Sequence, residues 1–412
     1  MADDRRHDVL ERGERYGSSD GDEFVDSELS EEAAEVLEEE EQDIQERGAA
    51  LLGNRRRVIG LIAAVVLLIV AIYVILPKVV GIGDSIDKVG DAKWYWVVTA
   101  IGFNVLSVVA YMALFRGVLA GRDPADPVHK RLNMRSSYQI TMAGFTATIL
   151  FSAAGAGGVA LTYWALRKAG MERRRAACRL VAFTVLLYSM YALALLIFGI
   201  LLRTGVLPGD NPAGGTIVPA VVAGALLVIT ALVSTVPEDA ERRIRKLGKR
   251  GARWARVAAA IVRVPATLAS GVRTAIAYLR HPKRQAQAIL GAIGWWAGNI
   301  GILWSCFQAF GIAVPFGVIV MGYFVGMFAN LAPSPAGGVG TVDAGLIAAF
   351  VLFGIPIEAV IPAVLLFRVV GFWLPIPVGI HAYLQLRKTV QRWSEEKPGA
   401  TIKSKVTAAE AT

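Results

Sequence analysis

Two oppositely charged residues, Asp343 and Arg368, stand inside long stretches of apolar residues. An ionised group at the centre of a bilayer costs roughly 2.5–3.5 kcal/mol on insertion scales, so such groups usually pair or face water. We therefore expect these two side chains to lie near each other. They could form a purely structural ion pair, or a switchable pair in which Arg368 meets a lipid phosphate while Asp343 takes a proton or a cationic headgroup.

Further candidates come from two glycine-rich segments inside apolar blocks, which read SAAGAGG before Val159 and NLAPSPAGGVGTVD from Asn330 to Asp343. Non-helical backbone is tolerated at membrane depth only where it is buried in protein or lines a wet cavity. The helix N-terminus beyond each segment presents free N–H groups and partial positive charge, which suits a phosphate. Alternatively, the segments are tightly packed kinks that bind nothing. Besides Asp343 and Arg368, the predicted substrate-binding residues are Gly157, Gly158, Tyr163, Asn330, Pro335, Gly337, Gly338 and Gly340.

Enzyme motifs are largely missing from the sequence. The four histidines are scattered, and no P-loop, Gly-x-Ser-x-Gly elbow or Asp-rich metal motif occurs. The segment AGAGGVA follows an apolar arm rather than a strand, so it does not indicate a nucleotide site. We predict no catalytic residue, no metal and no cofactor.

The elements that must hold these residues are membrane helices. Hydrophobic residues make up 55% of the 412 positions and fall in uncharged blocks long enough to cross about 30 Å of hydrocarbon. The sequence predicts an all-α integral membrane protein with about six full transmembrane helices and two re-entrant helical hairpins. The predicted spans are Val58–Leu76, Trp94–Leu119, Ala176–Leu202, Ile217–Val236, Ala286–Phe310 and Glu358–Leu386.

Loop charges predict the orientation. With both termini in the cytoplasm, the cytoplasmic segments hold 38 Lys and Arg and the outer loops hold four. The two broken blocks, residues 138–166 and 314–353, then each begin and end on one side, as a re-entrant hairpin would. Arms of about 12 residues in the first hairpin give about 18 Å of helix, too short to cross. The second hairpin has longer arms, and full crossing there stays open.

An inverted repeat follows from this topology. The tetrapeptide Ala-Gly-Gly-Val occurs at residues 156–159 and again at 336–339, each time in a hairpin that precedes a long span. The pairs Gly294/Gly298 and Gly322/Gly326 predict close helix packing. The predicted parts are an acidic cytoplasmic tail (1–57), a first membrane half (58–236), a basic cytoplasmic linker with an amphipathic segment (237–285), a second membrane half (286–388) and a cytoplasmic C-terminal tail (389–412).

The net charge differs along the chain. Residues 1–57 carry a net charge of −11 and the rest carries +20. In a membrane protein this basic excess is an orientation signal rather than a nucleic-acid footprint, so we predict no nucleic-acid partner. We expect the run RRIRKLGKR, from Arg242, to bind anionic lipid headgroups at the cytoplasmic face. The sequence leaves open whether the chain forms a homodimer.

The stretch from Pro333 to Leu386 resembles the C-terminal signature of the lysylphosphatidylglycerol synthase transmembrane family, also called flippase-like. That signature reads Pro-Gly-Gly-x-Gly-x-x-Glu, then Gly-x-Pro, then an Arg before aromatic-Trp-x-Pro. Ala336 intrudes between the proline and the glycines, and Asp343 replaces the usual Glu. The matching positions are Pro335, Gly337, Gly338, Gly340, Asp343, Gly354, Pro356, Arg368, Trp373 and Pro375.

The resemblance implies a lipid transporter of the bacterial inner membrane, like the flippase half of multiple peptide resistance factors. Its substrate would be an anionic or aminoacylated phospholipid, or a polyprenyl-linked glycolipid. Those factors add a cytosolic synthase domain, whereas about 25 residues follow the last span here, so lipid synthesis is not implied. Two other classes stay open. One is an intramembrane transferase acting on a polyprenyl phosphate, with Asp343 or Glu358 as its carboxylate, and the other is a non-transporting scaffold for envelope synthesis.

Overall fold

The computed structural model describes residues 92–121, 126–150, 156–234, 282–331 and 340–395, together with Ile276 and Gly338. Within these ranges every regular element is a helix and no strand occurs. The predicted acidic tail, the first predicted span, the amphipathic segment and the residues after Glu395 lie outside them.

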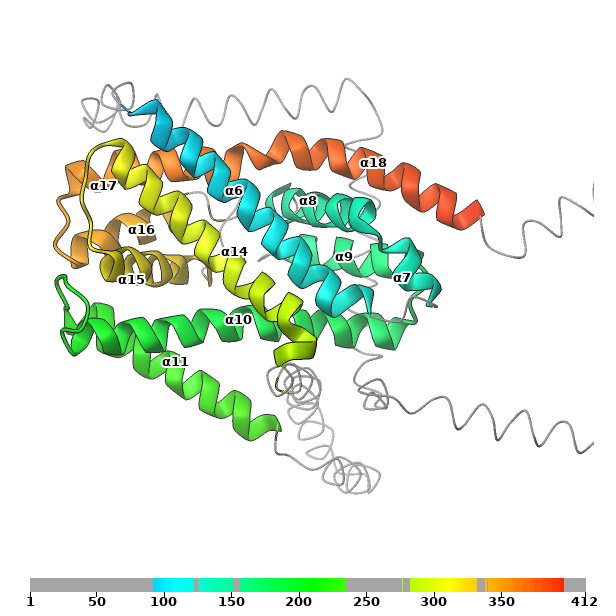
Figure 1. Ribbon diagram of the computed structural model, residues 1–412, viewed down its shortest axis with the longest axis horizontal. Coiled ribbons are helices and arrows are strands. Elements are labelled where there is room, and N and C mark those ends of the chain that lie inside the picture. Colours follow the sequence, from blue (N-terminus) through cyan, green and yellow to red (C-terminus); the bar gives the residue numbers. More distant parts are fainter. Residues whose placement is uncertain are drawn as a thin grey trace, which may run out of the picture.

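Figure 1 shows how the helices follow one another along the chain. Two of the elements are π-helices, η3 and η6, and one is a 3₁₀ helix, η4. The order is α6 (Trp94–Phe115), η3 (Arg116–Ala120), α7 (Pro127–Arg131), α8 (Met134–Leu150), α9 (Ala156–Lys168), α10 (Arg173–Arg203), α11 (Ala213–Ser234), α14 (Pro282–Ala309), α15 (Phe316–Met327), η4 (Phe328–Leu331), α16 (Thr341–Leu352), α17 (Ile357–Arg368), η6 (Val369–Trp373) and α18 (Pro375–Glu395).

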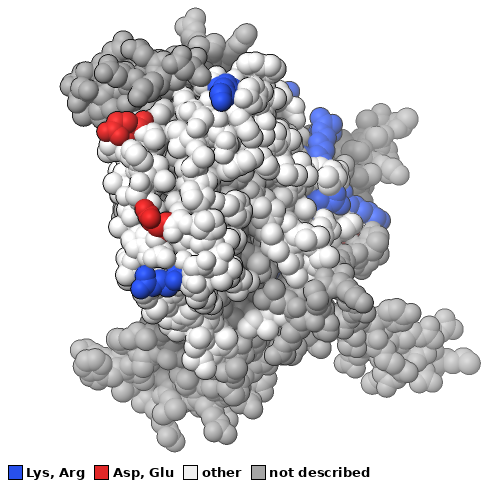
Figure 2. Space-filling view, turned by 60° about the vertical axis from the view of Figure 1, so that its left-hand side comes forward, with Lys and Arg blue, Asp and Glu red and all other residues white. Residues whose placement is uncertain are grey.

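Five helical segments are long and apolar enough to cross a membrane. They coincide with five of the six predicted spans, and the sixth lies outside the described residues. Their outward faces carry many exposed aliphatic side chains, and uncharged residues cover most of the described surface in Figure 2. The protein is therefore an all-α, multi-pass membrane protein. The five segments are Trp94–Ala120, Arg175–Arg203, Ala213–Leu232, Gln285–Ala309 and Ile357–Ser394.

Glycines line the most extensive helix contact, where α6 and α14 lie side by side (Figure 1). A Cβ built on Gly294 would lie 2.8 Å from Ala110 Cβ, and one on Gly298 would lie 2.6 Å from Ser107 Cβ. Without a hydrophobic force between helices in lipid, such small residues let backbones approach and gain dispersion energy. The predicted packing role of Gly294 and Gly298 is confirmed.

The glycine pair Gly322/Gly326 acts in the same way between α15 and α16. A Cβ on Gly322 would lie 2.7 Å from the Phe350 ring, and one on Gly326 would lie 2.7 Å from Leu346 Cα. These contacts make α15 and α16 an antiparallel hairpin, and the packing prediction for this pair is also confirmed.

The other hairpin is formed by α8 and α9, and its arms are longer than the roughly 12 residues predicted, so they are close in length to those of the second hairpin, where η4 continues α15. α8 and α9 have 17 and 13 residues, whereas α15 and α16 have 12 each. α8 is longer because Asn133 caps it, its Oδ1 accepting from the Ser136 N–H at 3.0 Å, so the helix begins before Tyr138. α16 is shorter because the Pro- and Gly-rich stretch delays its start to Thr341.

The repeated tetrapeptide also differs in placement between the hairpins. In the first hairpin Ala156 opens α9, so the tetrapeptide forms its first turn. In the second hairpin α16 begins at Thr341, so Gly338 lies before the helix. The helix ends are alike, because Met171 N donates to Leu166 O and Ile355 N donates to Phe350 O, both at 3.1 Å. Gly170 (φ 99°) and Gly354 (φ 78°) supply the left-handed residue that this helix end requires.

Candidate functional site

Arg368 is the last residue of α17, directly before the π-helical turn η6. The wide turn is marked by Leu374 N donating to Val369 O at 2.9 Å, five residues back. Pro375 follows, and its ring excludes the normal carbonyl position one turn earlier, which explains why the helix widens here. π-helical turns occur frequently at functional sites, because they redirect side chains within a long helix.

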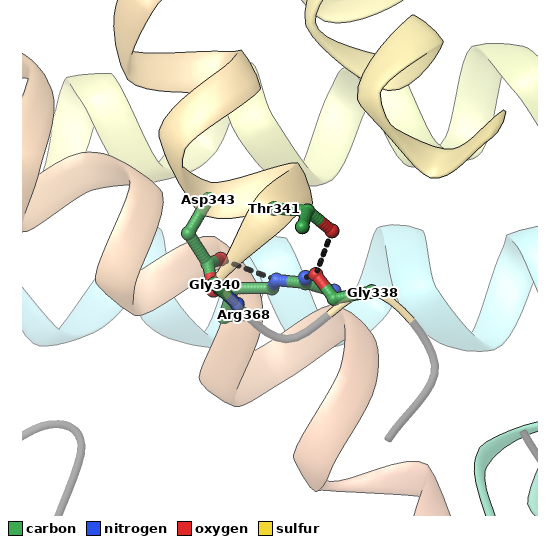
Figure 3. A network of polar contacts seen from close by, with 5 residues as sticks. All are labelled: Gly338, Gly340, Thr341, Asp343 and Arg368. Carbon is green, nitrogen blue, oxygen red and sulfur yellow. Dashed lines mark hydrogen bonds and ion pairs between the residues drawn. The ribbon is translucent and has the colours of Figure 1, made fainter. Parts of the chain in front are cut away.

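The Arg368 side chain is only 5% exposed and makes three contacts, of which Figure 3 shows those with Asp343 and Gly338. Its Nε donates to Asp343 Oδ1. Its Nη2 donates to the Gly338 carbonyl oxygen at 2.6 Å. Its guanidinium carbon lies 4.7 Å from the centre of the Phe372 ring, one turn along the chain. The charge is thus neutralised by a carboxylate, a carbonyl and an aromatic face.

Asp343 is held by the first turn of α16. Its Oδ2 accepts from the Gly340 N–H at 2.9 Å, and Thr341 Oγ1 donates to the Gly338 carbonyl at 3.4 Å (Figure 3). A carboxylate in the first helical turn also interacts favourably with the helix dipole. Gly338 (φ 86°) and Gly340 (φ 85°) adopt the left-handed conformation that favours glycine, and this turn directs the Gly338 carbonyl at Arg368.

The guanidinium retains unused hydrogen-bond donors. An arginine has five N–H donors, of which two belong to Nη1. Among the residues that the structure describes, Arg368 donates only from Nε and Nη2, and no acceptor lies at Nη1. Because guanidinium geometry matches phosphate and carboxylate oxygens, the unused edge could bind an anion without breaking the ion pair.

The prediction that Asp343 and Arg368 lie near each other is confirmed. Gly338 and Gly340 join them through backbone atoms. Asn330 borders the site, since a Cβ on Gly338 would lie 3.0 Å from Asn330 Oδ1. The predicted site residues Pro335 and Gly337 lie outside the described residues.

The site candidates Gly157, Gly158 and Tyr163 lie on α9, away from these contacts. A Cβ on Gly158 would lie 2.2 Å from Thr148 Oγ1, so this glycine brings α8 and α9 together. Gly157 and Tyr163 are buried. Packing accounts for Gly158, and a substrate role for all three stays a prediction.

Phe372 is a site residue that the sequence reading missed. The signal was available, because residues four apart share a helix face and Phe372 follows Arg368 by four. Glu358, the other carboxylate considered for a transferase, is exposed in the first turn of α17. Ten residues of helix separate it from Arg368, about 15 Å along the axis, so it does not join this site. Within the described residues no group of His, Cys, Asp and Glu side chains gathers as metal ligands.

Comparisons with known proteins agree with this picture. A search of the curated proteins found no match to the chain. The family model described as the lysylphosphatidylglycerol synthase TM region matches residues 57–379, well over half of the chain, and the match includes both Asp343 and Arg368. The chain therefore belongs to the lysylphosphatidylglycerol synthase transmembrane family.

Proposed function

We propose that this protein moves a phosphate-bearing lipid between the leaflets of the bacterial inner membrane. The substrate would be an anionic or aminoacylated phospholipid, or a lipid-linked sugar, and the tails would stay in the bilayer. One observation carries the proposal: Nη1 of the buried Arg368 guanidinium donates to no described residue. A lipid phosphate offers the oxygens that this edge would bind.

Asp343 would couple or select the substrate. A phosphate would first bind the Nη1 edge of Arg368 beside the intact ion pair, and its negative charge would then weaken the attraction between Arg368 and Asp343. Asp343 would then become free to take a proton or the amino group of an aminoacylated headgroup. Such a pair can drive a conformational change only if the substrate binds one access state more tightly than the other.

The hairpins support a site at mid-membrane depth. Helices α15 and α16 have 12 residues each, about 18 Å of helix, against a hydrocarbon core of about 30 Å. In Figure 1, α15 and α16 lie toward one end of the long axis and α8 and α9 lie beyond the centre. We infer two re-entrant hairpins entering from opposite leaflets as an inverted repeat, with the loop before α16 meeting the substrate.

The basic residues support an orientation with both termini in the cytoplasm. Arg131 and Arg135 flank the start of α8, and Arg387, Lys388 and Arg392 lie near the end of α18. These two regions are brought together because α8 packs along α18. By the positive-inside tendency, this end would face the cytoplasm and anionic lipid headgroups.

The test is transport by purified protein in liposomes that contain headgroup-labelled lipids. Phosphatidylglycerol, its aminoacylated form and a polyprenyl-linked sugar would be compared with a diacylglycerol-linked sugar that lacks phosphate. We expect one or more of the phosphate-bearing lipids to change leaflet and the phosphate-free lipid to stay. Arg368→Gln should stop transport, whereas the matched control Arg203→Gln, an exposed arginine at the end of α10, should not.

Each competing class predicts a different result. A transferase would convert a polyprenyl-linked substrate chemically and would need Asp343 as its carboxylate. A scaffold would move no lipid and would keep its cellular role in an Asp343→Asn, Arg368→Gln double variant. Phosphate-independent movement, or unchanged transport by Arg368→Gln, would contradict the proposed function.

A further inference from the structure

We infer that the contact between α8 and α18 is a gate on the route by which the lipid headgroup reaches Arg368. The gate is closed in this structure. When it opens, its polar side chains bind hydroxyl or amide groups of the headgroup. We call this contact the polar seam. The inference rests on the proposed function and adds a route and a ligand chemistry to it. The polar seam consists of Gln139 and Thr146 on α8 and Gly379, Gln385 and Thr389 on α18.

Helix α8 is unusually polar for a buried membrane helix. Most of the buried polar side chains in the described part of the chain lie on it, although two neighbouring helices cover it. Polar side chains inside a membrane are costly and commonly line substrate routes or join helices. The buried polar residues of α8 are Ser136, Ser137, Gln139, Thr141 and Thr146.

One end of the polar seam is closed by hydrogen bonds between side chains. Gln139 is 1% exposed, and its Nε2 donates to Gln385 Oε1 at 3.2 Å. Its Oε1 accepts from Thr389 Oγ1 at 2.9 Å. Gln385 Nε2 is also 2.8 Å from Nε2 of His381, which is exposed. The amide of Gln139 is thus satisfied only by the side chains of α18 and would need new partners if the helices separated.

The other end of the polar seam is closed by Thr146 and Gly379. A Cβ built on Gly379 would lie 1.8 Å from Thr146 Oγ1 and 2.6 Å from the Met142 carbonyl oxygen. No side chain larger than hydrogen fits there while the helices touch. The threonine hydroxyl thus faces the seam directly, at a point where α18 has no side chain.

Thr146 is 4% exposed, and its hydroxyl finds no hydrogen-bond partner within the described residues. Thr141, which is also buried on α8, shares this lack of a partner within the described residues, whereas two half-buried threonines nearby do not. Thr148 Oγ1 donates to Gly144 O, and Thr162 Oγ1 donates to Gly158 O, each to the carbonyl four residues back. A buried hydroxyl without a partner is uncommon, so its position calls for an explanation. What distinguishes Thr146 is its position against Gly379, which fits a hydroxyl that gains a partner when α8 and α18 separate.

The polar seam also lies where such a route must run. Gly379 lies 11 residues after Arg368, roughly 16 Å along the helix, and Gln385 lies 17 residues after Arg368, roughly 26 Å along the helix. Arg387, Lys388 and Arg392 follow at the basic end. A headgroup entering from that end would meet Gln139 and Gln385 first, then Thr146, and then Arg368.

A reversible cross-link tests the gate. Thr146→Cys and Gly379→Cys are combined after Cys178 and Cys306 are replaced by Ala. The Cβ position at Gly379 lies 3.0 Å from Thr146 Cβ, whereas disulfides span about 3.5–4.5 Å, so the helices must shift apart slightly before the disulfide forms and holds them together. We expect oxidation to reduce lipid transport about tenfold or more, and a reductant to restore it, as for a locked gate.

The matched control is a cross-link at a contact that should stay closed. Gly294→Cys with Ala110→Cys joins α14 to α6, where the Cβ separation is 2.8 Å. Oxidation of this pair should leave transport unchanged. Full cross-linking of Thr146→Cys to Gly379→Cys with unchanged transport would overturn the inference and leave the proposed function standing.

A second measurement does not depend on transport. Thr146→Cys and Ala147→Cys are labelled with a membrane-impermeant maleimide in inside-out vesicles containing phosphatidylglycerol. Both native residues are 4% exposed and lie at the same depth of α8. We expect Thr146→Cys to react about tenfold faster, because only its face opens. Equal labelling rates would contradict the gate. If the wild-type protein moved no lipid, the proposed function would be wrong, but the ratio of labelling rates would still show whether the polar seam opens.

Discussion

Arg368 and Asp343, 25 residues apart, form an ion pair at the N-terminus of α16, where the guanidinium Nε donates to the carboxylate Oδ1. The carboxylate accepts a second bond from the Gly340 N–H, whereas the guanidinium keeps Nη1 free of described acceptors. Arg368 therefore has more unused hydrogen-bonding capacity toward the described residues than Asp343 has. An incoming anion would accordingly bind to the arginine of the pair.

The first prediction separates a transport role of this pair from a structural one. Asp343→Asn and Arg368→Gln should each abolish transport while the protein still elutes as a folded species. Each variant should also lower stability by about 3 kcal/mol, because removing one partner leaves a buried group uncompensated. Thermal unfolding in detergent measures this loss.

The double variant Asp343→Asn, Arg368→Gln gives the control for that prediction. Removing both charges should recover much of the stability, because no buried charge is then left alone. Transport should stay absent. A double variant that transports normally would mean that the pair only holds the loop before α16 to α17.

The second prediction concerns the Phe372 ring, whose face contacts the Arg368 guanidinium. Phe372→Leu removes the cation–π contact and should weaken binding of a phosphate-bearing lipid by about 0.5–2 kcal/mol, which is about two- to thirtyfold. Phe372→Tyr keeps an aromatic ring and should stay near wild type. The half-saturating lipid concentration in the liposome assay measures the effect. Equal losses in both variants would point to packing instead.

The third prediction concerns the contact between α6 and α14. Gly298→Ala places a Cβ 2.6 Å from Ser107 Cβ and should destabilise the protein by about 1–3 kcal/mol, because the helices must move apart. Gly102→Ala on α6 has nothing within 4 Å of the new Cβ. It should be neutral or stabilising by up to about 1 kcal/mol, because alanine favours helix. A thermal shift of the same sign in both variants would count against this packing.

The fourth prediction concerns the link between α10 and α15. The Tyr191 hydroxyl donates to the Phe324 carbonyl, and the Tyr191 ring packs edge-on against Phe324 and Trp296. Tyr191→Phe should cost about 1 kcal/mol, the typical net value of one hydrogen bond. Tyr191→Leu should cost more, because the ring contacts are lost as well. Unfolding midpoints of the two variants, compared with wild type, test this order.

Much of the architecture could be predicted from the sequence. Five described spans lie where uncharged blocks of sufficient length occur, because bilayer thickness alone fixes how long such a block must be. The pairing of Asp343 with Arg368 was predictable for a similar reason, since an isolated charge in lipid is costly. The helix ends were less predictable: Asn133 starts α8 earlier than apolarity indicates, and Pro375 places a π-helical turn inside one predicted span.

The sequence by itself determined that this chain crosses a membrane and that it holds one acid and one base which must meet. Only the tertiary structure decided what surrounds them: the Gly338 carbonyl, the Phe372 ring and a guanidinium edge to which no described residue offers an acceptor. It also decided that Gln139 meets Gln385, 246 residues away. The physical reason is that hydropathy records only how each segment partitions into lipid. Which helix faces then touch depends on side-chain shape and on hydrogen bonds that form after the helices are in place.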